Sequence, residues 1–111
     1  MSGKRETLKS KIEIRSLFQE GIRLSSKSIR VILRRNHSSG NRFLFCSDKT
    51  SKNSVQRNRT KRVLRVLSQD SEIGFPEGYD IALVAGKEFS DMKLQDRKNI
   101  LSKVLSRFHG E

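Results

Sequence analysis

The sequence lacks the residues from which enzyme active sites and metal centres are usually built. It has one cysteine, Cys46, so an internal disulfide is excluded and no disulfide partner is expected, as is usual in the reducing cytoplasm. Its two histidines, His37 and His109, lie in a predicted loop and at the C-terminal end. No cluster of His, Cys, Asp and Glu has metal-ligand spacing, and no Ser/His/Asp arrangement or phosphate-binding glycine loop is present. We therefore expect no catalytic residue and no cofactor bound by the protein alone.

Long hydrophobic stretches are missing as well. The longest, residues 81–85, is far shorter than the roughly 20 residues of a membrane-spanning helix, and the first residues do not lead into a signal peptide. A hydrophobic content of 33% in 111 residues allows one thin core. We expect a cytoplasmic protein without a membrane partner, with a single domain over residues 1–111 and a flexible basic N-terminus at residues 1–9.

Carboxylates are scarce in the first part of the chain. Residues 1–69 contain 18 basic and 4 acidic residues, whereas residues 70–111 contain 6 basic and 8 acidic ones. The first part therefore carries a net charge of +14 and the second −2, which together give the formal net charge of +12, and between Glu20 and Asp70 the only carboxylate is Asp48. Such an excess of one sign predicts an anionic partner, such as a phosphate backbone.

The positive charge is densest in residues 52–65, which read KNSVQRNRTKRVLR. If a helix begins near Ser54, a turn of about 3.6 residues gathers its polar side chains on one side. These are Arg57, Lys61 and Arg65 in one row, and Asn58 and Arg62 in the row beside it. The apolar side chains expected to pack are Val55, Val63, Val66 and Leu67. Cations four residues apart repel one another, so a row without carboxylate partners predicts an anion outside the chain.

A first helix is expected over residues 11–20. Ser10 and Glu13 have the spacing of a capping box, and Gly21 stands where a left-handed residue would end the helix. The apolar stripe of this helix consists of Ile14, Leu17 and Phe18.

Strands are expected over residues 28–34, 42–47 and 80–85. The strands at residues 42–47 and 80–85 should be parallel, because the central helix, which should end near Ser68, connects them. The loop at residues 36–41 should join the first two strands in a hairpin. A last helix should begin with a cap at Ser90 and lie on the sheet. The predicted order is helix, two or three strands, helix, strand, helix.

Two features allow two interpretations each. Phe18 is either a core aromatic or part of a groove for an unpaired base. Arg30 and Arg34 flank Ile32 on the second side of the strand at residues 28–34, and this side is either solvated or offers charge to phosphate.

The run from residue 42 to residue 65 also carries a specific pattern. Residues 42–50 read RFLFCSDKT, residues 52–55 read KNSV, and residues 57–62 read RNRTKR. Without a gap, this resembles the protein subunit of bacterial ribonuclease P, in which a strand of the type RIGISVSKK precedes a GNAV turn and an RNRxKR helix. The positions that keep the family's residue types are Asn53, Val55, Arg57, Asn58, Arg59, Lys61 and Arg62.

The similarity extends to residues 13–21, 79–85 and 90–108. Six positions depart from the family pattern. Leu44 and Lys52 replace glycine, Asp48 and Thr50 replace serine and lysine, Ile14 replaces an aromatic residue, and Gly86 replaces arginine. The resemblance implies an α/β (α+β) two-layer sandwich of ribosomal-protein-like type, with an about four-stranded sheet and a left-handed strand–helix–strand crossover.

The resemblance also implies a function. Ribonuclease P removes the 5′ leader of precursor tRNA, and its large RNA subunit carries the catalytic centre with divalent cations such as Mg²⁺. The protein would bind and position RNA without cleaving it alone. By the resemblance, the residues that dock on the catalytic RNA are Lys49, Lys52, Asn53, Arg57, Asn58, Arg59, Lys61, Arg62 and Arg65. The cleft for the single-stranded leader would be lined by Ile14, Phe18, Arg30, Ile32 and Arg34.

A structural RNA-binding protein of ribosomal type, with no processing role, is the alternative that composition and charge leave open. A self-sufficient nuclease is a third and more distant possibility. The ungapped register of residues 53–62 favours the ribonuclease P subunit.

Overall fold

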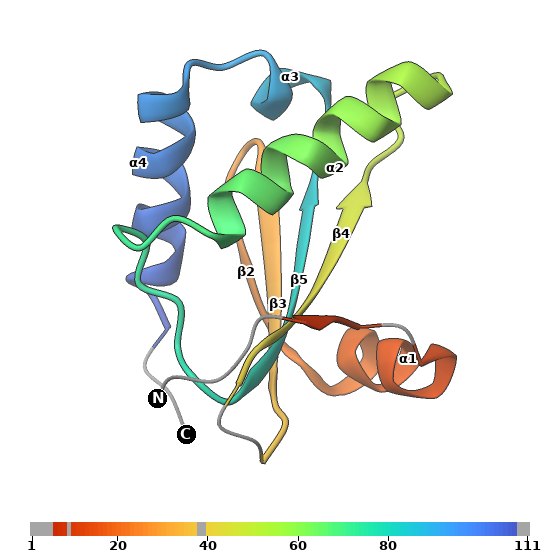
Figure 1. The fold of residues 1–111 in the computed structure, drawn as a ribbon, viewed down its shortest axis with the longest axis vertical. Coiled ribbons are helices and arrows are strands. Elements are labelled where there is room, and N and C mark those ends of the chain that lie inside the picture. The colour runs from red at the N-terminus through yellow and green to blue at the C-terminus, as the bar shows by residue number, and fades with distance from the viewer. Residues whose placement is uncertain (1–5, 9, 38–39, 109–111) are drawn as a thin grey trace.

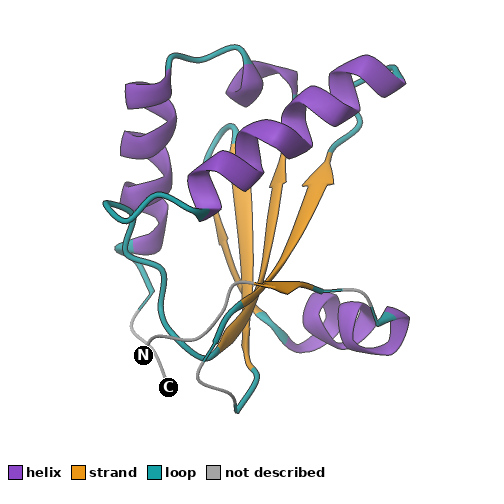
Figure 2. Cartoon of the chain, in the orientation of Figure 1, coloured by secondary structure: helices purple, strands orange, loops and turns teal. Residues whose placement is uncertain are grey.

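The structure, a computed structural model, describes residues 6–8, 10–37 and 40–108 (Figures 1 and 2). In chain order, the described elements are β1 (Glu6–Thr7), α1 (Lys11–Glu20), β2 (Ile22–Ser25), β3 (Ile29–Arg35), β4 (Arg42–Ser47), α2 (Ser54–Ser68), β5 (Tyr79–Ala85), α3 (Lys87–Ser90) and α4 (Leu94–Leu105). The first helix, the central helix and the three predicted strands are confirmed. His109 lies outside the described residues.

The described strands form one mixed sheet in the order β1-β4-β5-β3-β2. β4 is parallel to β5 and to β1, and β3 is antiparallel to β5 and to β2. Apart from the two-residue β1, this is the predicted four-stranded sheet. In Figure 1, β4 and β5 point upward, α2 crosses the near face of the sheet, and β5 lies to the left of β4. This crossover is left-handed, as the resemblance implied, and opposite to the usual hand.

Alternation along the strands divides the apolar side chains between the two faces of the sheet. On one face, Val31, Leu33 and Ile81 lie in the main core with Leu64 of α2 and Leu101 of α4. On the other face, a smaller core under α1 is formed by Leu8, Leu17, Ile32 and Ala82, with Ile14, Phe18 and Leu44 packed against it. The main layer pair is therefore the sheet with α2 and α4, and α1 covers part of the second face.

One expectation about strand connections was wrong. The loop after β3 does not join a hairpin, because β5 lies between β3 and β4; the hairpin is formed by β2 and β3. Residues 6–8 belong to the segment that was expected to be a flexible N-terminus. There, β1 pairs with the edge of β4, and Leu8 is buried and donates its backbone N–H to the carbonyl of Phe43.

The end of α1 also differs from the prediction. Gly21 is extended (φ −70°, ψ 157°) and not left-handed. Glycine is required here by space, because a Cβ would lie 2.5 Å from the Leu17 carbonyl oxygen and 2.7 Å from Ile32 Cγ2. The chain can therefore turn directly from α1 into β2 while remaining pressed against the sheet.

The predicted last helix is two helices, and Ser90 does not cap it. Ser90 ends α3, and α4 begins after Lys93 without a side-chain cap. The predicted packing face of α2 was partly wrong as well. Val55 and Val66 are 77% and 53% exposed, and the buried positions are Thr60, Leu64, Leu67 and Ser68.

One arginine ties α1 to the sheet. Arg42 Nε donates to Asp80 Oδ1 at 2.8 Å, and its terminal nitrogens donate to Glu13 Oε1 and Oε2 at 3.0 and 2.6 Å. Asp80 is 1% exposed, so its charge requires this partner. Only half of the predicted capping box forms: the Ser10 hydroxyl accepts from the Glu13 N–H at 3.4 Å, while the Glu13 carboxylate is bound by Arg42.

This arrangement predicts a pH-dependent contribution of Glu13 to stability. The hydrogen bond from Arg42 lowers the pKa of Glu13 from its ordinary value of 4.5. A depressed carboxyl pKa stabilises the fold above the unfolded value, and this stabilisation is lost as the pH falls through the folded pKa. We expect Glu13→Gln to lower the free energy of unfolding near neutral pH, with the difference from wild type shrinking below about pH 4.5. Urea unfolding at a series of pH values measures this, and a pH-independent difference would contradict it.

Candidate nucleic-acid interface

The central helix begins at a well-formed cap. The Asn53 side chain accepts the Gln56 backbone N–H at 2.9 Å, and Gln56 Oε1 accepts the Lys52 backbone N–H at 2.8 Å. Asn53 therefore has a local structural task, in addition to the RNA contact that the resemblance implied. Among the described residues other than glycine, only His37 has a positive φ, so Lys52 stands in place of the family's glycine without backbone strain.

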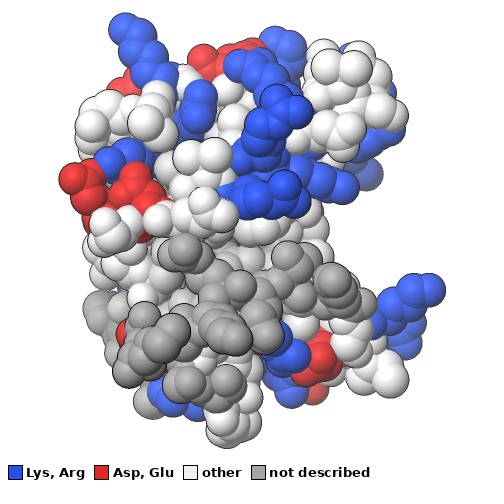
Figure 3. All heavy atoms as spheres, viewed as in Figure 1, with Lys and Arg blue, Asp and Glu red and all other residues white. Residues whose placement is uncertain are grey.

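The side chains predicted to meet RNA share one exposed side of α2. We define the α2 basic surface as Arg57, Asn58, Arg59, Lys61, Arg62 and Arg65, all of which are exposed. Figure 3 shows Lys and Arg gathered over the position that α2 occupies in Figure 1. Lys49, Lys52 and Asn53 in the preceding loop are also exposed.

Most of this surface has no acidic partner in the part of the chain that the structure describes. Within the described residues, no ion pair involves Arg57, Lys61 or Arg62, and Arg57 contacts the Ser54 hydroxyl at 3.4 Å. The Arg65 guanidinium lies 5.8 Å from the centroid of the Phe45 ring. Such stacking holds a guanidinium in place while leaving its N–H edges available.

Arg59 is the exception to the prediction of unpaired cations. Its Nη1 lies 2.5 Å from Asp91 Oδ1, and its Nη2 donates to the Ser90 carbonyl at 3.1 Å. Asp91 also pairs with Lys87 at 2.8 Å, and the hydrogen bonds from Lys87 and Arg59 lower the pKa of Asp91. The spacing of residues along α2 could not predict Asp91 as a partner of Arg59, because Asp91 lies at the end of α3.

Beneath the surface, buried hydroxyl groups join α2 to its neighbours. Thr60 Oγ1 lies 3.2 Å from Ser51 Oγ and 2.7 Å from Ser90 Oγ, and Ser90 Oγ donates to the Gly86 carbonyl at 2.9 Å. We call Ser51, Thr60 and Ser90 the hydroxyl ladder. Sequence reasoning missed it, because nothing in the local pattern shows that three hydroxyls from separate segments will meet.

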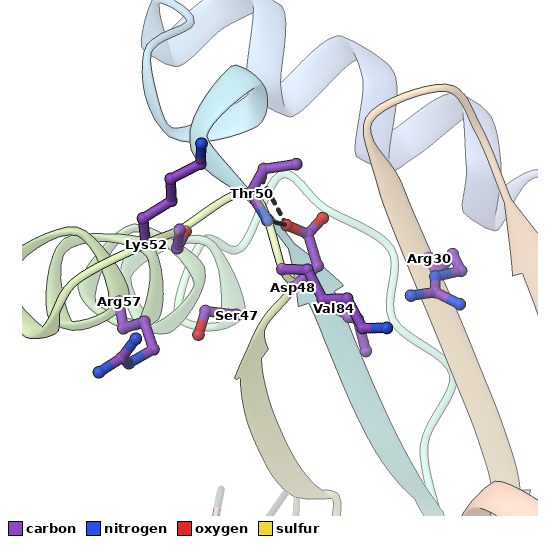
Figure 4. A pocket seen from close by; sticks show the side chains of 9 residues that line it. Arg30, Ser47, Asp48, Thr50, Lys52, Arg57 and Val84 are labelled. Atoms are coloured by element: carbon purple, nitrogen blue, oxygen red, sulfur yellow. Dashed lines mark hydrogen bonds between the residues drawn. The ribbon is translucent and has the colours of Figure 1, made fainter.

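An open pocket of about 790 Å³ lies beside the loop between β4 and α2 (Figure 4). The charged residues that line it are Arg30, Asp48, Lys49, Lys52 and Arg57. In Figure 4, Arg57 at the start of α2 and Arg30 on β3 stand on opposite sides, with Asp48 and Val84 between them. We call this the Arg30 pocket. Its charge suits an anionic ligand, and it unites one residue of the predicted leader cleft with three of the residues predicted to dock on the catalytic RNA.

Two departures from the family pattern, Asp48 and Thr50, lie side by side in the lining of this pocket, and a third, Gly86, lies against them. Asp48 Oδ1 accepts the backbone N–H and the hydroxyl of Thr50 at 2.9 and 2.5 Å, and Thr50 Oγ1 accepts the Lys87 N–H at 3.0 Å. A Cβ on Gly86 would lie 2.0 Å from Thr50 Oγ1 and 2.2 Å from Asp48 Oδ1. Gly86 thus leaves the space that the Asp48 and Thr50 side chains occupy.

The rest of the predicted leader cleft is dispersed. Ile32 is 3% exposed, because α1 covers it, so it is unavailable as a contact residue. Ile14 and Phe18 are half-buried against the same small core. Arg34 pairs with Glu20 at 3.3 Å and lines a different pocket, with Arg35 and His37. The structure therefore separates Arg34 from Arg30.

In the described part of the chain, no group of three or more His, Cys, Asp and Glu could hold a metal ion, and no helix has both the length and the hydrophobicity of a membrane span. Burial raises the pKa of the Cys46 thiol, which keeps it in the less reactive protonated form.

Comparisons with known proteins identify relatives over most of the chain. The family described as Ribonuclease P matches residues 2–109. A ribonuclease P protein component of Petrotoga mobilis is 30% identical over 103 residues, which are 92% of this chain and 87% of that protein. One of Pelotomaculum thermopropionicum is 33% identical over 66 residues, which are 60% of this chain but only 59% of that protein.

Solved structures show the same fold. The RNase P protein from Thermotoga maritima aligns with a TM-score of 0.79 at 24% identity, over 96% of this chain and 100% of that one. The RNase P protein of Staphylococcus aureus aligns with a TM-score of 0.73 at 23% identity, over 96% and 95% of the two chains.

The hydroxyl ladder predicts a specific loss of stability. Thr60→Val keeps the shape of the side chain but leaves the buried Ser51 hydroxyl without its partner. We expect the free energy of unfolding to fall by about 1–3 kcal/mol, measured by urea denaturation. Ser102→Ala, which removes an exposed hydroxyl from α4, should cost far less. Equal stability of Thr60→Val and wild type would contradict a role of the ladder in holding α2.

Proposed function

The chain belongs to the ribonuclease P protein family, and we propose that it is the protein subunit of a ribonucleoprotein that removes the 5′ leader from precursor tRNA. In this proposal the protein binds the catalytic RNA and the single-stranded leader, and so tightens and broadens substrate binding. It is an accessory subunit of an RNA-based endoribonuclease, and the RNA subunit performs the cleavage. The complex would act in the cytoplasm.

The α2 basic surface is the proposed contact with the catalytic RNA. The observation that carries this proposal is a set of exposed cations fixed on one rigid helix, most of them without an acidic partner among the described residues. Guanidinium groups bind phosphate oxygens with two parallel hydrogen bonds, and Asn58 adds an amide that can donate and accept. A folded RNA supplies phosphates at the fixed spacing that such a surface requires.

The Arg30 pocket is the proposed contact with the leader. It lies on the part of the second sheet face that α1 leaves uncovered, where Arg30 and Val84 are paired across β3 and β5. A groove lined by cations binds the backbone of a flexible single strand with little regard to its sequence. This differs from the predicted cleft in that Ile32 and Arg34 take no part.

Divalent cations such as Mg²⁺ would act through the RNA subunit. The protein's role in this proposal is to neutralise phosphate charge and to fix RNA geometry, which reduces the magnesium needed for folding and substrate binding.

Reconstitution tests the proposal. With a bacterial ribonuclease P RNA at low magnesium, the protein should increase cleavage of precursor tRNA at the leader junction. No effect on cleavage, together with tight binding to structured RNA, would indicate a purely structural RNA-binding protein. Cleavage by the protein after nuclease digestion of any copurifying RNA would indicate a self-sufficient nuclease.

Arg62→Ala should weaken association with the catalytic RNA by about tenfold, because Arg62 is exposed and held by no described partner. The slope of log affinity against log salt should become shallower by roughly 1, as one fewer counterion is released. The matched control is Arg107→Ala, which removes the same charge from beyond the end of α4. Equal effects of both variants would show that overall charge, and not the α2 basic surface, determines binding.

Arg30→Ala should weaken the binding of precursor tRNA to the reconstituted enzyme several-fold more than that of mature tRNA, since only the precursor carries a leader. Lys103→Ala, an exposed cation on α4, should change the two affinities alike. The comparison is made from equilibrium binding of both tRNAs at one salt concentration. If the ratio of precursor affinity to mature tRNA affinity is unchanged in Arg30→Ala, the leader does not bind in the Arg30 pocket.

A further inference from the structure

Asp91 stands out because it places a negative charge against a surface that otherwise attracts phosphate. Within the described residues, it is the only carboxylate paired with a member of the α2 basic surface. It lies at the end of α3, a helix of four residues, directly after the buried Ser90.

The contacts of Asp91 fix the direction of one guanidinium. Its Oδ1 lies 2.5 Å from Arg59 Nη1, its Oδ2 lies 2.8 Å from Lys87 Nζ, and Arg59 Nη2 donates to the Ser90 carbonyl at 3.1 Å. These bonds leave the Arg59 Nε–H and one N–H on each terminal nitrogen for an external acceptor. A guanidinium held in this way presents these three N–H groups to a phosphate in fixed directions.

The base of this arrangement is rigid. Ser90 is part of the hydroxyl ladder with Thr60, which adjoins Arg59 in α2. By contrast, the Arg59 and Asp91 side chains are 53% and 41% exposed. An ion pair this exposed contributes little to the stability of the fold. Stability therefore does not explain why a carboxylate is placed beside Arg59.

We propose that Asp91 is a positioning and specificity-determining residue: it orients Arg59 for phosphates of the catalytic RNA and repels phosphates that approach in other geometries. This inference rests on the proposed function. Removing the carboxylate should have two opposite effects. Attraction to any RNA increases by one charge, whereas the catalytic RNA loses a pre-oriented guanidinium.

The test is the variant Asp91→Asn in the full-length protein. Affinities are measured for a bacterial ribonuclease P RNA and for an unrelated structured RNA of equal length, over a range of salt concentrations. We expect binding of the unrelated RNA to become tighter with a steeper salt slope, and the preference for ribonuclease P RNA to fall by about fivefold.

Two further variants separate position from charge. Asp96→Asn removes the same charge from an exposed position on α4 and should change both affinities alike. Asp91→Glu keeps the carboxylate and should retain most of the preference. Urea unfolding of Asp91→Asn should remain close to that of wild type, which separates the effect from misfolding.

Each other outcome overturns a stated claim. If Asp91→Asn and Asp96→Asn change both affinities equally, Asp91 acts only through net charge and the inference is wrong. If Asp91→Asn increases the preference, Asp91 competes with the catalytic RNA, and the inference is wrong as well. If the wild-type protein shows no preference for ribonuclease P RNA, the proposed function fails first.

Discussion

Repulsion among the cations of α2 is the constraint on which the rest of the structure depends. Arg57, Lys61 and Arg65 follow one another at spacings that disfavour an isolated helix. The helix is held instead from its inner side and its beginning: Leu64 and Leu67 are buried, Thr60 joins the hydroxyl ladder, and Asn53 caps the first turn. The buried side of α2 thus stabilises a row of cations that, apart from Arg59, has no acidic partner among the described residues.

On the second face of the sheet, the position of α1 is set by charged side chains. There, the bonds from Arg42 to Asp80 and Glu13 draw α1 over one end of the strands. Gly21 lets α1 approach closely, and Ile32 is covered as a result. The other end, where Arg30 is exposed, is not covered by α1 and borders the loop that leads into α2. One charge network, anchored on the buried Asp80, therefore decides which part of this face can meet a ligand.

Elements whose signals lie within a few residues of the chain could be predicted, whereas contacts between distant segments could not. The boundaries of α1 and α2 depend on caps and periodicity within a few residues, and they were predicted well. The predicted hairpin between β3 and β4 was wrong because β5, which follows both in the sequence, lies between them in the sheet. The local sequence of β3 and β4 does not show this. Asp91 was missed for the same reason: it lies 32 residues from Arg59, and only the tertiary fold joins them. The predicted cleft combined Arg30 and Arg34 because they share a face of β3, whereas α1 separates their surroundings.

The two proposed RNA contacts are not independent surfaces. Lys52 and Arg57 line the Arg30 pocket and also stand at the beginning of α2. The loop between β4 and α2 is fastened to α3 by the bond between Thr50 and Lys87, and α3 is fastened to α2 through the hydroxyl ladder. A strand in the pocket and an RNA on α2 would thus be held by one rigid unit at a fixed separation. Such a unit needs no catalytic group of its own, because fixing the distance between two RNAs already reduces the entropy cost of bringing them together.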